Sequence, residues 1–154
     1  MKRITTPLAL AAAIAATAAA CAINATGATP QTATLTLQGK QVPASFHYVD
    51  QRPRGESSGD TISFSETLYA GQTRVGFSEV GGTLADHKRH DATNLSGTLI
   101  LHDGTIVLEG TSLGKAPTQH VAIVGGTGAY ADAHGEDTIT TGRTGTTHQL
   151  TYTQ

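Results

Sequence analysis

The feature that most constrains the fold is the hydrophobic period, which from residue 33 onward is two rather than 3.6. Gly, Thr and Asp interrupt the pattern about every 8 to 12 residues, as in sandwiches and barrels. Successive side chains of a strand point to opposite faces, so the pattern predicts half-buried strands and an all-β fold. Nine strands are predicted, at residues 33–37, 41–48, 60–69, 73–84, 95–101, 105–110, 119–124, 136–141 and 146–153.

Short connections between these strands favour an antiparallel arrangement. The pair Asp103-Gly104 lies between two predicted strands and supplies the positive φ angles of a tight hairpin turn. Eight or nine such strands close most economically into a barrel, because closure removes exposed sheet edges. We therefore expect a single antiparallel barrel of eight, or up to nine, strands, and an eight-stranded barrel can hold one small ligand.

The first residues resemble an export signal. Lys2 and Arg3 precede an uncharged, Ala-rich run over residues 4–20. Two processing outcomes stay open: a signal peptide over residues 1–25, or a lipoprotein signal over residues 1–20 with Cys21 as the lipid anchor. Residues 26–32 are expected to form a flexible tether and residues 33–154 the barrel. The expected location is extracellular, with the protein either free or anchored through Cys21.

Charge and composition exclude several classes of function. Without Lys2 and Arg3, the chain keeps 8 basic and 12 acidic residues, a net charge of −4 with neutral histidines, which argues against binding to nucleic acid. No later segment is apolar and long enough for a transmembrane helix. Cys21 is the single cysteine, so the barrel is expected to contain no disulfide.

Two segments resemble known families. Residues 59–71, GDTISFSETLYAG, are similar to the G-D-x-x-x-F-x-x-x-L-Y-x-G strand of allene oxide cyclases and to a dirigent strand. Residues 124–135, VGGTGAYADAHG, resemble the dirigent V-G-G-T-G-x-F…A-R-G signature. The resemblance spans about residues 48–141 and implies the calycin-like barrel of these families, whose members are commonly homotrimers. Independently of the families, the glycines of residues 125–128 suit a barrel corner better than a nucleotide-binding loop, because no helix is patterned after them.

The chain departs from the cyclases at their reactive positions. Glu66 stands where the cyclase strand has an Asn, and Gly82 or a neighbour stands opposite the cyclase Cys. The resemblance therefore implies that the chain is not a true allene oxide cyclase. Glu66 does align with an acidic residue of the dirigent strand, which keeps a dirigent-like or other cyclase activity open.

Glu66 is the principal catalytic candidate. It alternates with Ile62, Phe64 and Leu68 and is expected to point into the lumen. Partial desolvation there is expected to raise its pKa toward a value useful for general acid or base catalysis. The competing interpretation is that Glu66 pairs with Arg74 or Arg143, or reaches the barrel mouth.

The remaining candidates are less constrained by pattern. Asp50 is a second catalytic candidate near the family-like motifs, and the ligand-binding candidates are Phe64, Tyr48, Tyr69, Arg74, Glu109 and Tyr130. Tyr130 is favoured to pack against the Gly-rich corner, and Glu109 with Arg74 is a candidate ion pair in the lumen. Residues 87–90, HKRH, are interpreted as a charged surface loop rather than a metal site, and we expect neither metal nor cofactor.

These features predict an exported barrel that binds a small hydrophobic or phenolic molecule and directs its cyclisation or coupling without a redox cofactor. If it is an enzyme, it is a cofactor-independent isomerase or cyclase. The alternatives are a non-catalytic, lipocalin-like binding protein or surface lipoprotein, and a structural protein with a filled lumen. Two or more titratable groups converging on an open cavity would favour catalysis, one or none would favour a carrier.

Overall fold

The structure is a computed structural model, and it describes residues 30–86, 91–114 and 116–154. The predicted leader, the lipid anchor at Cys21 and the 87–90 loop lie outside the described residues, as do residues 26–29 of the predicted tether. Over the described ranges, no helix is long and apolar enough to cross a membrane.

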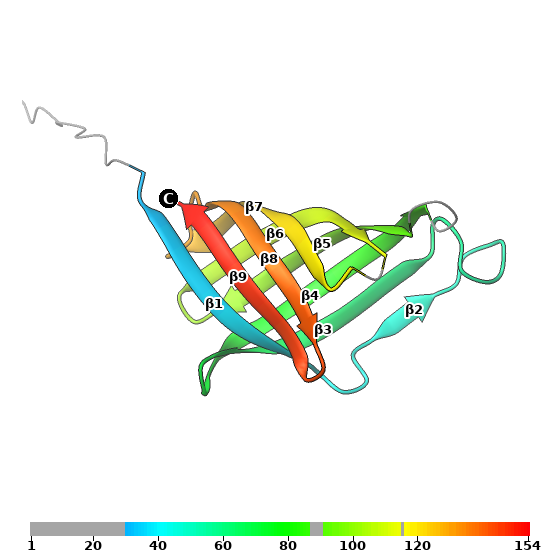
Figure 1. The fold of residues 1–154 in the computed structure, drawn as a ribbon, viewed down its shortest axis with the longest axis horizontal. Coiled ribbons are helices and arrows are strands. Elements are labelled where there is room, and N and C mark those ends of the chain that lie inside the picture. The colour runs from blue at the N-terminus through cyan, green and yellow to red at the C-terminus, as the bar shows by residue number, and fades with distance from the viewer. Residues whose placement is uncertain (1–29, 87–90, 115) are drawn as a thin grey trace, which may run out of the picture.

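Nine strands make up the fold (Figure 1). They are β1 (Thr32–Gln41), β2 (His47–Val49), β3 (Thr61–Ala70), β4 (Thr73–Asp86), β5 (Ala92–Leu101), β6 (Gly104–Leu113), β7 (Thr118–Gly128), β8 (His134–Gly142) and β9 (Gly145–Thr153). The predicted all-β class is confirmed, and most strands run a few residues further than the hydrophobic pattern indicates because ladder pairing continues into polar segments.

The sheet closes on itself. Its order is β1-β9-β8-β7-β6-β5-β4-β3-β2, and antiparallel pairing of Gln38–Gln41 in β1 with residues 66–69 of β3 completes the ring. The short β2 pairs with residues 61–63 of β3 and lies outside that ring. The protein is thus a closed eight-stranded antiparallel barrel with one additional strand, as the strand count predicts.

The predicted strand over residues 41–48 is wrong between residues 42 and 46. β1 continues through Gln41, and the chain then turns before the three residues of β2. Pro43 has no N–H to offer a ladder, and Ala44 has a positive φ of 61°, so extended pairing cannot pass through these positions. The turn is held by Ser45, whose Oγ donates to the carbonyl of Val42 at 2.8 Å.

The Gly-rich segment forms the predicted corner. β7 carries an extra residue opposite the Val107/Leu108 step of β6, which is a β-bulge. Gly128 follows with a φ of 63°, and a Cβ at Gly126 would overlap the carbonyl oxygens of Thr105 and Tyr130. Close backbone approach and positive φ thus explain these two glycines.

The inner face of the barrel changes character along its axis. One part is filled by a hydrophobic core, whose buried members are Leu37, Leu68, Leu99, Ile106, Leu108, Val121, Ile123, Ala133, Leu150 and Tyr152. Along β3, the inward sequence runs from Ile62 and Phe64 through Glu66 to the core residue Leu68. The half of the barrel beyond Glu66 is therefore free to hold a cavity.

Candidate functional site

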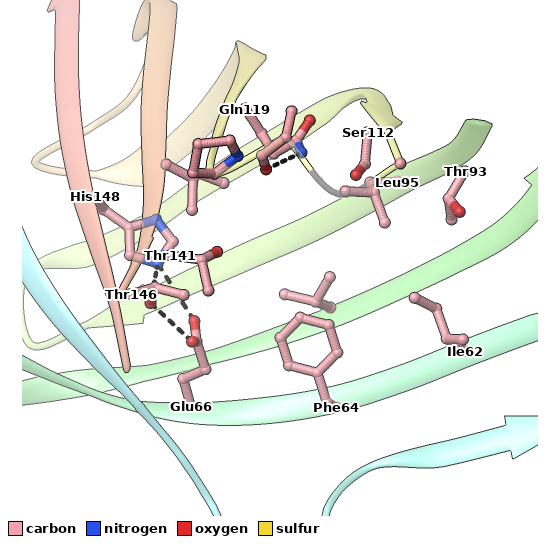
Figure 2. A pocket seen from close by; sticks show the side chains of 15 residues that line it. Ile62, Phe64, Glu66, Thr93, Leu95, Ser112, Gln119, Thr141, Thr146 and His148 are labelled. Atoms are coloured by element: carbon pink, nitrogen blue, oxygen red, sulfur yellow. Dashed lines mark hydrogen bonds and ion pairs between the residues drawn. The ribbon is translucent and has the colours of Figure 1, made fainter. Parts of the chain in front are cut away.

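A cavity of about 610 Å³ occupies this half of the barrel (Figure 2). Its walls are mainly apolar, from Ile62 and Phe64 on β3, Val80 on β4, Leu95 on β5 and Ile139 on β8. Ala116 and Pro117 of the β6–β7 connection contribute further apolar surface. This volume and lining suit a small, largely hydrophobic molecule.

A layer of polar side chains separates the cavity from the core. It consists of Glu66, Ser78, Asp137 and His148, which are between 0% and 3% exposed. Glu66 and His148 also line the cavity, whereas Ser78 and Asp137 lie behind them. Buried charges are costly unless they are paired and hydrogen-bonded, so the contacts within this layer decide what it can do.

His148 joins two carboxylates. Its Nδ1 lies 2.7 Å from Asp137 Oδ2 and its Nε2 lies 3.3 Å from Glu66 Oε2. Thr146 Oγ1 donates to Glu66 Oε1 at 2.8 Å, and Ser78 Oγ donates to Glu66 Oε2 at 3.3 Å. Figure 2 shows Glu66, Thr146 and His148 converging at one side of the cavity.

These contacts set the protonation of the group. Burial lowers the pKa of His148, but hydrogen bonds to Asp137 and Glu66 and their charges outweigh burial and raise it to about 9. Burial raises the pKa of Glu66, but hydrogen bonds from His148, Thr146 and Ser78, with the charge of His148, lower it overall. The expectation of a raised Glu66 pKa is therefore wrong, because the buried imidazolium compensates the carboxylate.

Glu66 does not pair with Arg74 or Arg143 as the competing interpretation proposes. Its ion pair is with His148, and no contact among the described residues joins it to either arginine. With both carboxylates ionised and His148 protonated, the buried group carries one uncompensated negative charge. Asp137 Oδ1 has no hydrogen-bond partner among the described residues.

A glycine lets this group assemble across the barrel. β1 lies between β3 and β9, so Glu66 and His148 come from strands that are not neighbours at this point. Gly39 of β1 sits beneath them, where a Cβ would overlap Thr146 Oγ1 and lie 2.9 Å from Glu66 Oε2. The missing side chain leaves the space in which the Glu66 carboxylate meets its partners.

Two sequence-predicted residues, Glu66 and Phe64, line the cavity. Tyr48 and Asp50 do not line it. Tyr48 donates its hydroxyl to Asp60, a fully buried carboxylate that also accepts from the backbone N–H groups of Gln51 and Ser57 at 2.7 and 2.8 Å. Asp50 Oδ2 accepts from the Gly55 N–H at 3.1 Å, so both candidates organise the loop between β2 and β3.

The other ligand-binding candidates also lie away from the cavity. Tyr69 stacks beneath Lys40, whose Nζ is 4.9 Å from the ring centroid, and Arg74 lines a separate hollow beside Val75 and His102. Glu109 is exposed, so it forms no ion pair with Arg74 in the lumen. Tyr130 packs edge-on against Tyr152, with ring centroids 6.1 Å apart, which matches the packing role expected for it.

Sequence reasoning missed His148 and Asp137. A signal was present, because His148 alternates with the apolar residues Leu150 and Tyr152, and Asp137 is two residues from Ile139. The same alternation that singled out Glu66 therefore places both inward. In the described part of the chain, no group of three or more His, Cys, Asp or Glu side chains is arranged to hold a metal ion.

Comparisons with known proteins match the fold. No family model matches the chain, and no curated protein matches it significantly. Among solved structures, a pyocyanin demethylase is 24% identical, with a TM-score of 0.72 over 78% of this chain and 99% of its own. The pterocarpan synthase dirigent protein GePTS1 is 18% identical, with a TM-score of 0.65 over 81% of this chain and 86% of its own.

A third structure extends the range of reactions found on this barrel. AbnU, an exo-specific intermolecular Diels-Alderase, is 14% identical, with a TM-score of 0.60 over 80% of this chain and 99% of its own. At these identities the likeness establishes architecture alone. The chain has the barrel fold that dirigent proteins and Diels-Alderases share.

Proposed function

We propose that the protein binds a small hydrophobic or phenolic molecule in the barrel and isomerises or cyclises it by proton transfer, without a redox cofactor. The observation that carries this proposal is the contact between Glu66 and His148 at the cavity wall, with Asp137 buried behind them. Two titratable groups converge on an open, apolar cavity, which favours catalysis over simple carriage.

Glu66 is the proton-transfer group in this proposal. Both ring nitrogens of His148 are occupied by carboxylates, whereas the carboxylate of Glu66 also lines the cavity. It accepts a proton from an O–H or an activated C–H of the ligand, and the buried group then becomes neutral. Returning that proton to a different ligand atom breaks the new O–H bond of Glu66, restores the carboxylate and completes an isomerisation.

His148 and Asp137 have supporting tasks. The imidazolium donates to Glu66 Oε2 and to Asp137 Oδ2, which fixes its ring and keeps the Glu66 carboxylate oriented. The cavity supplies the rest by excluding water and restricting the ligand to reactive conformations. The names of solved structures with this fold, a demethylase, a dirigent protein and a Diels-Alderase, support small-molecule chemistry in such a barrel.

The proposal also includes an extracellular location and a homotrimeric assembly. Lys2, Arg3 and the Ala-rich run support export, with release after residue 25 or anchoring through Cys21. Assembly as a homotrimer is implied by the family resemblance. A mass measurement of the mature protein decides between cleavage and acylation.

Native mass spectrometry of the purified protein, followed by release of the bound molecule, identifies the ligand. Incubation of that complex in deuterated water then tests proton transfer, and we expect deuterium in the ligand. Glu66→Gln should abolish incorporation while the cavity stays intact, and Glu79→Gln, a change to a carboxylate that accepts from Ser65 outside the cavity, should leave it unchanged. Ligand binding without deuterium uptake in the unaltered protein would instead indicate a carrier.

A further inference from the structure

A second cavity adjoins the first. It has a volume of about 540 Å³ and lies under the turn between β8 and β9. Four residues line both cavities: Phe64, Glu66, Thr141 and Thr146. Glu66 therefore lies between two adjoining spaces and lines both of them.

The two cavities differ in polarity. The first is walled mainly by aliphatic side chains, whereas the second is lined by Gln41, Arg143, Thr144 and the turn glycines, with Phe46 as an added aromatic wall. A ligand confined to the first, apolar cavity would not contact the polar side chains that line the second. A ligand with an apolar body and a polar end would fit both spaces.

The charges of the second cavity are unequal. Arg143 is exposed in the β8–β9 turn, and Lys40 lies at the rim with its Nζ held over the Tyr69 ring. Among the described residues lining this cavity, Glu66 is the sole carboxylate, and the buried group that it forms with His148 and Asp137 carries one negative charge against the two positive charges of Arg143 and Lys40. An anion entering under the turn would therefore meet a net positive surface, with the guanidinium as its strongest hydrogen-bond donor.

We infer that the second cavity is a subsite for an anionic substituent, such as a carboxylate or sulfonate, on a ligand whose apolar ring system occupies the first cavity. The inference deepens the proposed function and rests on it. It makes Arg143 a specificity residue, with Lys40 adding to the local positive potential. The ligand atom next to Glu66 would then be the one that links the ring system to the charged end.

Two dyes with the same ring system test this. Anilinonaphthalene sulfonate carries the anion, and N-phenylnaphthylamine lacks it. Fluorescence titration should show the sulfonate binding about three- to ten-fold more tightly than the neutral dye, and the preference should fall as salt is added. Arg143→Gln should reduce the ratio of the two dissociation constants toward one, whereas Arg143→Lys should keep part of it.

Arg74→Gln is the matched control, because Arg74 lines a separate hollow that shares no residue with either cavity. It should leave the ratio unchanged. If the neutral dye binds and the ratio is near one, or if Arg143→Gln leaves a high ratio intact, the anionic subsite is refuted and the apolar cavity stands. If neither dye binds, both the subsite and the proposed ligand class fail.

Discussion

His148 Nδ1 lies 2.7 Å from Asp137 Oδ2, and both side chains are almost completely buried. The other nitrogen of the same ring, Nε2, lies 3.3 Å from Glu66 Oε2. The imidazolium is therefore the element that allows two carboxylates to remain charged inside a barrel, since each unpaired buried charge would cost several kcal/mol.

The stability of the protein should depend on pH through His148. Its pKa is raised from 6.5 to about 9, so the folded state binds the proton more tightly than the unfolded chain. The resulting stabilisation is fully present below pH 6.5 and is lost as pH rises through about 9. Calorimetry should show Tm falling across this window, on the order of 10 °C for a domain of this size.

Nitrogen NMR of the His148 ring in the unaltered protein measures the same pKa directly, and a midpoint near the ordinary 6.5 would contradict the prediction.

Asp137→Asn should lower the pKa of His148 and reduce stability by about 1 to 3 kcal/mol, because the Nδ1–H of the buried imidazolium then donates to a neutral amide oxygen instead of a carboxylate. Chemical denaturation measures the loss. Glu136→Gln removes the neighbouring, exposed carboxylate and should change stability by less than about 1 kcal/mol. Equal effects of the two substitutions would show that burial of the Asp137 pair has no special energetic consequence.

Gly39→Ala should disturb the site directly. The added Cβ would overlap Thr146 Oγ1 and approach Glu66 Oε2 at 2.9 Å, so the Thr146 side chain must rotate or β1 must shift. We expect a loss of about 1 to 3 kcal/mol and of deuterium transfer to the ligand. Gly81→Ala is the control, since its Cβ would meet nothing within 4 Å, and it should be neutral or slightly stabilising.

Thr146→Val removes the hydroxyl that donates to Glu66 Oε1 and preserves its shape. Because that hydrogen bond helps to lower the Glu66 pKa, the pKa should rise in the variant. Carbon NMR of the Glu66 carboxyl group follows this titration without a substrate. The lowered pKa of Glu66 stabilises the folded state above pH 4.5, the pKa of the unfolded chain, and this stabilisation is lost as pH falls through the pKa of the folded state. Because the pKa of the folded state is higher in the variant, the variant should lose this stabilisation at a higher pH than the unaltered protein.

Asp60→Asn should destabilise the loop between β2 and β3 without changing binding in the cavity. The buried Asp60 carboxylate accepts from Tyr48, Gln51 and Ser57, and none of these residues lines either cavity. Proteolysis within residues 50–59 should become faster, whereas the affinity for N-phenylnaphthylamine should be unchanged. A large loss of dye affinity would show that Tyr48 contributes to ligand binding after all.

The alternation of apolar and polar residues in the sequence determined much of this fold by itself. Side chains of a strand change face at every residue, so the pattern of period two predicted strands, a barrel and an inward-facing Glu66. The same rule could have found His148 beside Leu150. It failed between residues 41 and 48, where Pro43 and Ala44 impose a turn that the apolar pattern does not reveal.

The partners of Glu66 were decided by the tertiary structure. Glu66 and His148 are 82 positions apart, and they meet because β1 pairs with both β3 and β9 when the barrel closes. The register of those ladders and the absent side chain of Gly39 fix the contact, and neither is encoded in a local pattern. The sign of the Glu66 pKa shift follows from that contact, because burial alone raises the pKa and only the imidazolium and the hydroxyl donors reverse it.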